Sequence, residues 1–379
     1  MKGVSRIDDS PIARWWWSVD HASLGLIAAL MMIGVVLLFA AGPGAAMRLQ
    51  IDNSFHFPLR QIFFIAPALA VIVIMSALTP LQARRAGAVL FGLMFASLLA
   101  ALLFAPEING AKRWFAFGPF SFQPSEFLKP GFVIVAAWML AEGARQPRFP
   151  GAVIACGLFA VCAGLLALQP DYGQAGLLTM VFMAMYFVSG GGLLLLTVVA
   201  TIAFGLFAAG YFFSPHLAAR VDAFLNPGEG EAYQVDKALE AIANGGFAGR
   251  ADAAAPVKFS LPDAQTDFIF AVAAEEYGMI LCALIITLFM ALVVRAFVKA
   301  GALKSVFAQT AVCGLASLIG LQSLINIGVN LRALPAKGMT LPFISYGGSS
   351  LIAAALTVGL ILALTRRQSL ADRRKDVMP

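Results

Sequence analysis

The sequence predicts an all-α membrane protein with about ten transmembrane helices and a large extracytoplasmic loop between helices 7 and 8. Of the 379 residues, 60% are hydrophobic and only 12% are charged, whereas soluble domains average about 25% charged residues. Apolar runs recur along the chain, and many reach the length of about 20 residues that a bilayer-spanning helix needs. A soluble fold is therefore strongly disfavoured.

Ten positions mark the expected starts of the spans. They are Ser23, Arg60, Ala86, Glu126, Gly151, Ala175, Gly192, Phe268, Ser305 and Ser349. The span from Ala175 is short and lies between two tight turns. The polar start of the chain leads into a run long enough to stay in the membrane, so no cleavable signal peptide is expected. Trp15, Trp16 and Trp17 precede that run and fit an interfacial aromatic anchor.

The distribution of cations predicts the orientation of the chain. An even number of spans puts both termini on one side, and that side holds most of the Lys and Arg residues. They are Lys2, Arg6, Arg14, Arg84, Arg85, Arg145, Arg148, Arg295, Lys299, Lys304, Arg366, Arg367, Arg373, Arg374 and Lys375. The positive-inside rule therefore places both termini in the cytoplasm.

This orientation divides the chain into three parts. Residues 1–22 form a cytoplasmic segment, residues 23–365 the membrane domain, and residues 366–379 a basic cytoplasmic tail. The loops at about 106–125, 214–266 and 332–348 lie outside. Within the second of these loops, YQVDKALEAIANGGFAG is typical of an amphipathic helix ended by glycines.

Composition excludes several function classes. The net charge of +6 comes from short clusters between apolar runs, so it indicates membrane orientation and not nucleic-acid binding. The four cysteines all lie inside apolar runs and predict neither disulfides nor a metal site. His21, His56 and His216 are too scattered to predict a metal site.

Ionisable groups within or beside a membrane span are costly, so each one is a functional candidate. The loop that starts at Pro106 carries the first group: Lys112, Arg113, Trp114, Glu126 and Lys129. Cations beside aromatic side chains could hold a phosphate against the membrane surface. Interfacial anchoring explains Trp114 and Arg113 equally well.

Acidic residues supply two further candidates. Asp171 lies in the turn LQPDYGQA between two apolar runs, where capping of the next helix is the alternative role. Asp267 precedes the eighth span, and Glu275 and Glu276 follow inside it. On a straight helix Glu275 would lie about 12 Å deeper than Asp267, and the two glutamates would point in different directions. We expect these glutamates to form a buried ion pair with a cation of another helix.

Polar residues near the end of the chain form two more groups. Gln322, Asn326 and Asn330 recur every four residues and make one polar stripe, which either joins helices or lines a wet cavity. Arg332 and Lys337 lie in the outside loop that follows, although an isolated Lys at a membrane edge usually snorkels. The same loop continues to Ser345 and Ser349, which we include as substrate-binding candidates.

Together these groups suit an anionic, lipid-linked substrate at the outer face. A carboxylate could act as general base on a hydroxyl nucleophile, while cations or a metal stabilise a departing pyrophosphate. The same groups are expected in a lipid transporter. Physical reasoning alone therefore leaves both functions open.

Five ordered blocks separate these functions. They are GAKRWFAFGPFSFQPSEFLKP, LQPDYGQA, AIANGGFAG, TDFIFAVAAEEYG and PAKGMTLPFISYGGSS. Their order, from the third span to the tenth, resembles the SEDS family of cell-wall glycosyltransferases. The resemblance implies about ten membrane helices and the polymerisation of lipid II into glycan strands. The lysine in PAKGMTLPF is typical of the branch that acts in cell division, with the elongation polymerases as the close alternative.

The resemblance also implies roles for single residues. Asp267 matches the essential aspartate of the family, and Lys337 matches the lysine of the division branch. Trp114, Glu126 and Lys129 match conserved outside-loop positions. The chain departs from the family pattern at three positions, where Glu, His and Leu are more usual. They are Asp263, Gln265 and Tyr172.

Partners and location follow from the same resemblance. It implies lipid II as substrate, a class B penicillin-binding transpeptidase and other divisome membrane proteins as partners, and membrane lipid as surroundings. The expected location is the bacterial cytoplasmic (inner) membrane at the division septum. A divalent cation, Mg or Mn, could take part, and no other cofactor is expected. A lipid II flippase and a non-catalytic division scaffold are the competing functions.

Overall fold

The computed structural model describes residues 10–107, 111–118, 120–213, 215–225, 232–250, 257–335 and 338–366. Among these residues, nine helices are long and apolar enough to cross a membrane. A tenth apolar helix, α7 (Tyr172–Val188), is shorter, with 17 residues. This agrees with the prediction of about ten spans, including the short one from Ala175.

The spans alternate with short connections, apart from one long segment between α8 and α12. The nine long spans are α2 (His21–Arg48), α3 (His56–Ser76), α4 (Pro80–Phe104), α5 (Pro124–Arg145), α6 (Gly151–Leu168), α8 (Leu193–Phe213), α12 (Ile269–Gly301), α13 (Val306–Asn330) and α14 (Gly348–Thr365). The other elements are α1 (Pro11–Ser18), the hairpin β1 (Phe115–Phe117) and β2 (Phe120–Phe122), α9 (Pro215–Leu225), α10 (Ala232–Gly245) and α11 (Val257–Ser260).

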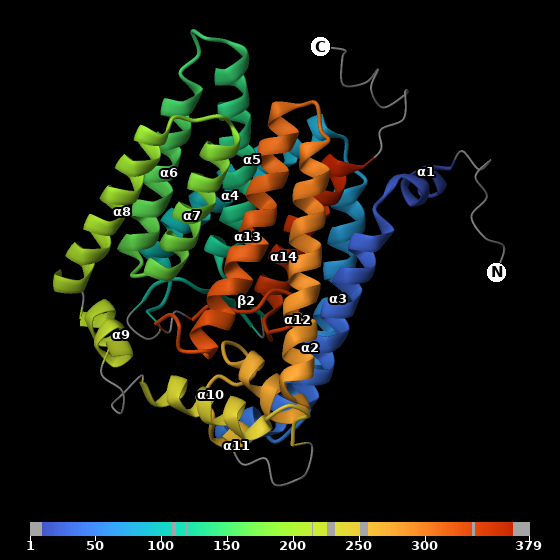
Figure 1. Cartoon of the computed structure of the whole chain (residues 1–379), viewed down its shortest axis with the longest axis vertical. Helices are drawn as coiled ribbons and strands as arrows, with labels where there is room; N and C mark the ends of the chain where they lie inside the picture. The colour runs from blue at the N-terminus through green and yellow to red at the C-terminus, as the bar shows by residue number, and fades with distance from the viewer. Residues whose placement is uncertain are drawn as a thin grey trace.

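The helices form one bundle with distinct ends (Figure 1). Helices α9, α10 and α11 lie at one end, and α1 and the C-terminal end of α14 lie at the other. The spans of α5, α13 and α14 are the most buried, whereas α8 has no buried residue and lies at the edge of the bundle. Helix α10 confirms the amphipathic helix predicted in the long loop.

Helix α12 is kinked near its start, which corrects the straight eighth span assumed from the sequence. Gly278 has a φ of 74° and a ψ of −174°, values that are not helical and that favour glycine. The kink makes room for the loop after α10, because Met279 N–H donates to the Gly246 carbonyl at 3.0 Å. The straight span on which the predicted depth of Glu275 relied is therefore not present, and that depth stays a prediction.

A non-helical segment, residues 338–347, runs between α13 and α14. Its apolar side chains are buried, including Leu341, Phe343 and Ile344. Irregular backbone at membrane depth is tolerated only where protein surrounds it. Helix α2 packs closely against this segment at Gly34, where an added Cβ would lie 2.7 Å from the carbonyl oxygen of Phe343.

Helix α1 lies beside the first span and contains the three tryptophans. Ser10 caps it by accepting from Ala13 N–H at 3.2 Å. Trp15 Nε1 donates to Ser76 Oγ at 2.9 Å, whereas Trp16 and Trp17 stay exposed. This arrangement agrees with the predicted interfacial anchor, although the helix itself was not predicted.

Candidate functional site

Asp267 lies in a tight turn just before α12. The main-chain N–H groups of Thr266, Asp267 and Phe268 all donate to the Asp263 carbonyl, at 3.0, 3.0 and 3.2 Å. Asp263 itself has a φ of 50°, a conformation that Asp tolerates better than most residues. The N-cap of α12 is Phe268, so Asp267 does not occupy the capping position of this helix.

Two amides of α13 hold the main chain of this turn. The side-chain nitrogens of Asn326 and Asn330 both donate to the Asp267 carbonyl, at 2.9 and 3.0 Å. Asn330 Oδ1 also accepts from the Ala271 N–H at 3.1 Å. Because residues four apart share one face of a helix, the stripe is well placed to make these bonds together. The Asp267 backbone is thus fixed without use of its carboxylate.

The same stripe holds the segment that follows α13. Asn326 Nδ2 donates to the Met339 carbonyl at 2.6 Å, and Gln322 Nε2 donates to the Thr340 carbonyl at 3.1 Å. Of the two roles left open by the sequence, these contacts fit the joining of segments. A Cβ on Gly338 would lie 3.7 Å from Asp267 Oδ2, so the carboxylate lies beside this segment. Lys337 lies outside the described residues.

Ser345 joins the same two segments from the other side. Its hydroxyl donates to the Thr266 carbonyl at 2.5 Å and accepts from Leu341 N–H at 2.8 Å. Gln61 of α3 donates to the Ser345 carbonyl at 3.3 Å. Ser349 lies half-buried in the first turn of α14. Helices α3 and α13 therefore both hold the segments that surround Asp267.

A second polar cluster lies at the start of α5. Lys129 Nζ donates to Glu126 Oε2 at 3.0 Å and to Gln174 Oε1 of α7 at 2.7 Å. Gln174 Nε2 closes the triangle by donating to Glu126 Oε1 at 2.7 Å. Only 1% of Lys129 is exposed. The sequence predicted that Glu126 and Lys129 act together, but it missed Gln174.

Arg113 links the outer loop to the turn before α7. Its guanidinium donates to the carbonyls of Gln169, at 2.8 Å, and Pro170, and lies 3.8 Å from Asp171 Oδ1. Asp171 is the N-cap of α7, as the alternative role predicted. Burial raises the pKa of the Asp171 carboxyl, while Arg113 opposes that shift. The neighbouring Lys112 and Trp114 are half-buried.

Buried acceptors near these clusters have no hydrogen-bond partner within the described part of the chain. They are Ser125 Oγ, Asp171 Oδ2 and Gln265 Oε1. Buried polar groups are normally paired, so such atoms mark places where a ligand or water would complete the bonding. Ser125 adjoins Glu126 in the second cluster, and Gln265 lies in the turn of Asp267. Each cluster thus contains a buried polar atom whose bonding the described residues leave incomplete.

The two glutamates of α12 behave differently from one another. Glu276 pairs with Lys258 of α11 at 2.6 Å, which agrees with the expected ion pair. The ion pair expected for Glu275 is not found among the described residues. Glu275 accepts instead from the main-chain N–H groups of Val257 and Lys258 of α11, at 3.2 and 2.8 Å.

Arg332 pairs with the long loop. Its guanidinium lies 2.9 Å from Asp236 Oδ1 of α10. This ion pair joins the end of α13 to the outer helices. Arg332 was predicted from the sequence as a substrate-binding residue, and that role stays a prediction.

Two buried residues, Gln61 and Gln174, were missed by sequence reasoning. Both are uncharged, so a search for ionisable groups passed over them. A search for any polar side chain inside a span would have found both, since each lies in an apolar helix. Across the residues that the structure describes, no three His, Cys, Asp or Glu side chains group to hold a metal.

Comparison with known proteins decides the family. Residues 21–370 match the family model described as "Cell cycle protein", which covers FtsW, RodA and SpoVE. The chain belongs to this family. The resemblance to SEDS proteins that the five sequence blocks predicted is therefore confirmed.

Curated relatives carry the FtsW name. The chain is 42% identical over 364 residues to the "Probable peptidoglycan glycosyltransferase FtsW" of Caulobacter vibrioides (strain NA1000 / CB15N), covering 96% of this chain and 93% of the relative. It is 35% identical over 357 residues to the protein of the same name from Thiomicrospira cyclica (strain DSM 14477 / JCM 11371 / ALM1), covering 91% of each. These similarities favour the division branch, as the PAKGMTLPF lysine predicted.

Solved structures share the fold. One, described as "Structural coordination of polymerization and crosslinking by a peptidoglycan synthase complex", matches with a TM-score of 0.77 and 29% identity, over 92% of this chain and 97% of that one. The rod shape determining protein RodA of Thermus thermophilus matches with a TM-score of 0.70 and 29% identity, over 93% and 99%. The predicted all-α membrane architecture is therefore confirmed.

Proposed function

We propose that this chain joins lipid II units into glycan strands at the outer face of the membrane, with Asp267 as the general base. The chain is a peptidoglycan glycosyltransferase that acts in septal wall synthesis during cell division, as the family match and the FtsW relatives together support. The observations that carry the assignment of Asp267 are the two amides that hold its main-chain carbonyl and the position of its carboxylate beside residue 338.

The reaction needs a base, an attacking hydroxyl and a stabilised leaving group. Asp267 takes the proton from the attacking sugar hydroxyl as the new glycosidic bond forms. The pyrophosphate carried by the lipid departs with the bonding electron pair, and outer-face cations offset its developing charge. Asn326 and Asn330 hold the Asp267 main chain, which keeps the point of attachment of the catalytic side chain in place during transfer.

The second cluster suits the binding of the substrate. Lys129 and Glu126 are fixed by Gln174, and Ser125 and Asp171 each offer a buried acceptor without a protein partner. Hydroxyl and amide groups of a sugar would complete those bonds. Lys112, Arg113 and Trp114 lie on the loop next to this cluster, and we propose that they guide the lipid-linked headgroup toward it.

Lys337→Ala is expected to slow lipid II polymerisation by about tenfold or more, because we propose that the charge of Lys337 offsets charge on the departing pyrophosphate. The measurement is the rate of glycan formation by purified protein with its partner transpeptidase. Lys237→Ala removes a cation from the exposed Lys237 to Glu240 pair of α10 and serves as the control. Equal rates for the Lys337→Ala variant and the parent would reduce Lys337 to a membrane anchor.

The proposed activity requires partners and a defined location. We propose a class B penicillin-binding transpeptidase as the partner, other divisome proteins as neighbours, and the division septum of the inner membrane as the site of action. The deciding experiment supplies purified protein, transpeptidase and lipid II. Polymer formation supports the proposal, whereas movement of lipid II between leaflets without polymer would indicate a flippase.

We propose further that both termini are cytoplasmic and that the long loop is outside. A cysteine placed at Glu240, an exposed residue of α10, is expected to react with a membrane-impermeant reagent in intact cells. A cysteine placed at Arg148, between α5 and α6, is expected to react only after the membrane is opened. The reverse pattern would invert the topology.

A further inference from the structure

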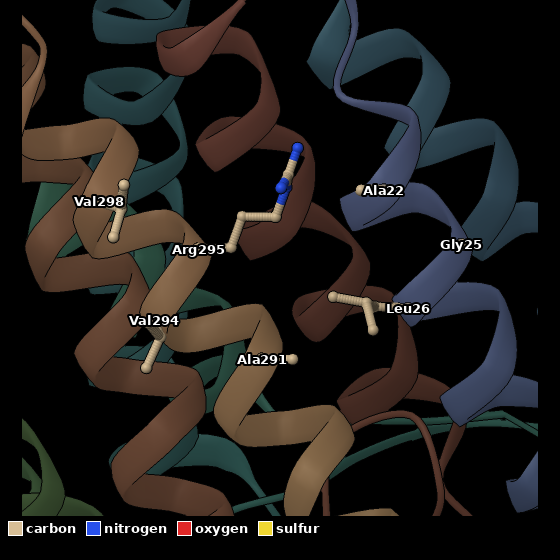
Figure 2. Close-up of a pocket in the computed structure, with 7 residues that line it drawn as sticks. All are labelled: Ala22, Gly25, Leu26, Ala291, Val294, Arg295 and Val298. Carbon is tan, nitrogen blue, oxygen red and sulfur yellow. The ribbon is translucent and has the colours of Figure 1, made fainter.

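A groove lies between α2 and α12 at the end of the bundle opposite the candidate site. It has a volume of about 510 Å³ and is lined by Ala22, Gly25, Leu26, Ala291, Val294, Arg295 and Val298. Figure 2 shows Arg295 and Leu26 reaching from opposite helices into the space between them. Gly25 leaves the groove open, since a Cβ there would meet no atom within 4 Å.

Positively charged side chains outnumber negatively charged ones at the mouth of this groove. Asp20 accepts from Arg295 through Nε at 2.7 Å and Nη2 at 2.6 Å. Lys299 Nζ lies 2.9 Å from the same carboxylate, and the Ser23 hydroxyl donates to it at 2.7 Å. Burial alone would raise the pKa of Asp20, but the hydrogen bonds from Arg295, Ser23 and Lys299 hold it well below its usual range.

Two cations therefore face one ionised acid, which leaves one net positive charge. The Asp20 side chain is only 6% exposed, whereas those of Arg295 and Lys299 are 41% and 30% exposed. Both cations thus keep accessible N–H groups besides those used by Asp20. The walls below them are apolar, and Val294 and Val298 are open to the surrounding lipid.

We propose that this groove binds one anionic phospholipid of the cytoplasmic leaflet, with its phosphate at Arg295 and Lys299 and an acyl chain along Gly25 and Ala291. The net charge matches one phosphodiester, and the apolar walls match a hydrocarbon chain. Basic pockets between spans on the cytoplasmic side are suited to such headgroups. A free phosphate ion would use the cations but leave the apolar groove unfilled.

The test counts lipids bound to the purified full-length protein by native mass spectrometry after titration with phosphatidylglycerol or phosphatidylcholine. The parent is expected to bind one phosphatidylglycerol about fivefold or more tightly than phosphatidylcholine. Arg295→Gln is expected to abolish this preference, while Lys299 still pairs with Asp20. Gly25→Leu is expected to fill the groove and to weaken binding of both lipids. Arg145→Gln changes an exposed cation elsewhere on the same side and is the control.

Several outcomes would overturn the proposal. They are equal affinity of the parent for the two lipids, parental binding by both groove variants, and loss of binding in the Arg145→Gln control. Cross-links from a cysteine at Val298 to a partner protein in cells, with no lipid retained, would assign the groove to a transmembrane helix instead. Melting curves of each variant separate loss of lipid from loss of fold.

Discussion

Asp267→Asn is expected to leave a folded, inserted protein that polymerises lipid II about 10²–10⁴-fold more slowly than the parent. Asn keeps the shape of the side chain but cannot take a proton from the attacking hydroxyl. The fold should survive because Asn326 and Asn330 hold the main-chain carbonyl of residue 267 and not its carboxylate. Single-turnover polymerisation with the partner transpeptidase measures the chemical step.

A matched control for this variant is Asp222→Asn. Asp222 is exposed on α9 and accepts from Tyr211, so the substitution removes one carboxylate from the same loop region without touching the turn. We expect it to polymerise at the parental rate. Full activity of a normally expressed Asp267→Asn protein would remove Asp267 from the chemistry.

Lys129→Met is expected to lower the free energy of unfolding by about 3–5 kcal/mol, because it leaves the Glu126 carboxylate buried without its cation. Gln174 can still donate to Glu126, but one neutral donor does not replace an ammonium group. Thermal unfolding of the purified protein in detergent measures the loss. Lys237→Met breaks an exposed pair and is expected to leave the unfolding temperature unchanged.

A double variant separates stability from function at the same place. Glu126→Leu combined with Lys129→Met removes both charges, so most of the lost stability should return. Polymerisation should not return if the cluster binds substrate. A stable and fully active double variant would make the cluster purely structural, and an unchanged melting temperature for Lys129→Met alone would contradict the buried pairing.

The spans were predictable because hydrophobicity over about 20 residues is a strong signal. The hydrogen bonds of Glu275 were not predictable, because a continuous helix was expected through Gly278. A single glycine in an apolar run carries no mark of a kink. The kink becomes evident only from the loop after α10, whose backbone fills the space that a straight helix would need.

The sequence identified single candidate residues of the site but not their arrangement. Asp267 and Lys129 were identified because a charged side chain at membrane depth is energetically costly and usually has a function. The amide stripe was found from its spacing, yet its partners are main-chain carbonyls that no sequence pattern specifies. Gln61, which reaches Ser345 from a distant part of the chain, was missed because it is uncharged.

The triangle of Glu126, Lys129 and Gln174 constrains how the protein is assembled during synthesis. Helix α5 has the lowest mean hydropathy of the spans, 1.4, and carries both charges. Their partner Gln174 lies on α7, which leaves the ribosome later. Until α7 enters the bilayer, the ion pair of α5 lacks the hydrogen bonds that Gln174 adds to it, and lipid cannot supply them. We therefore expect the fourth span to complete its packing only after the sixth is made, and a nascent chain that stops before α7 to be a target of quality-control proteases.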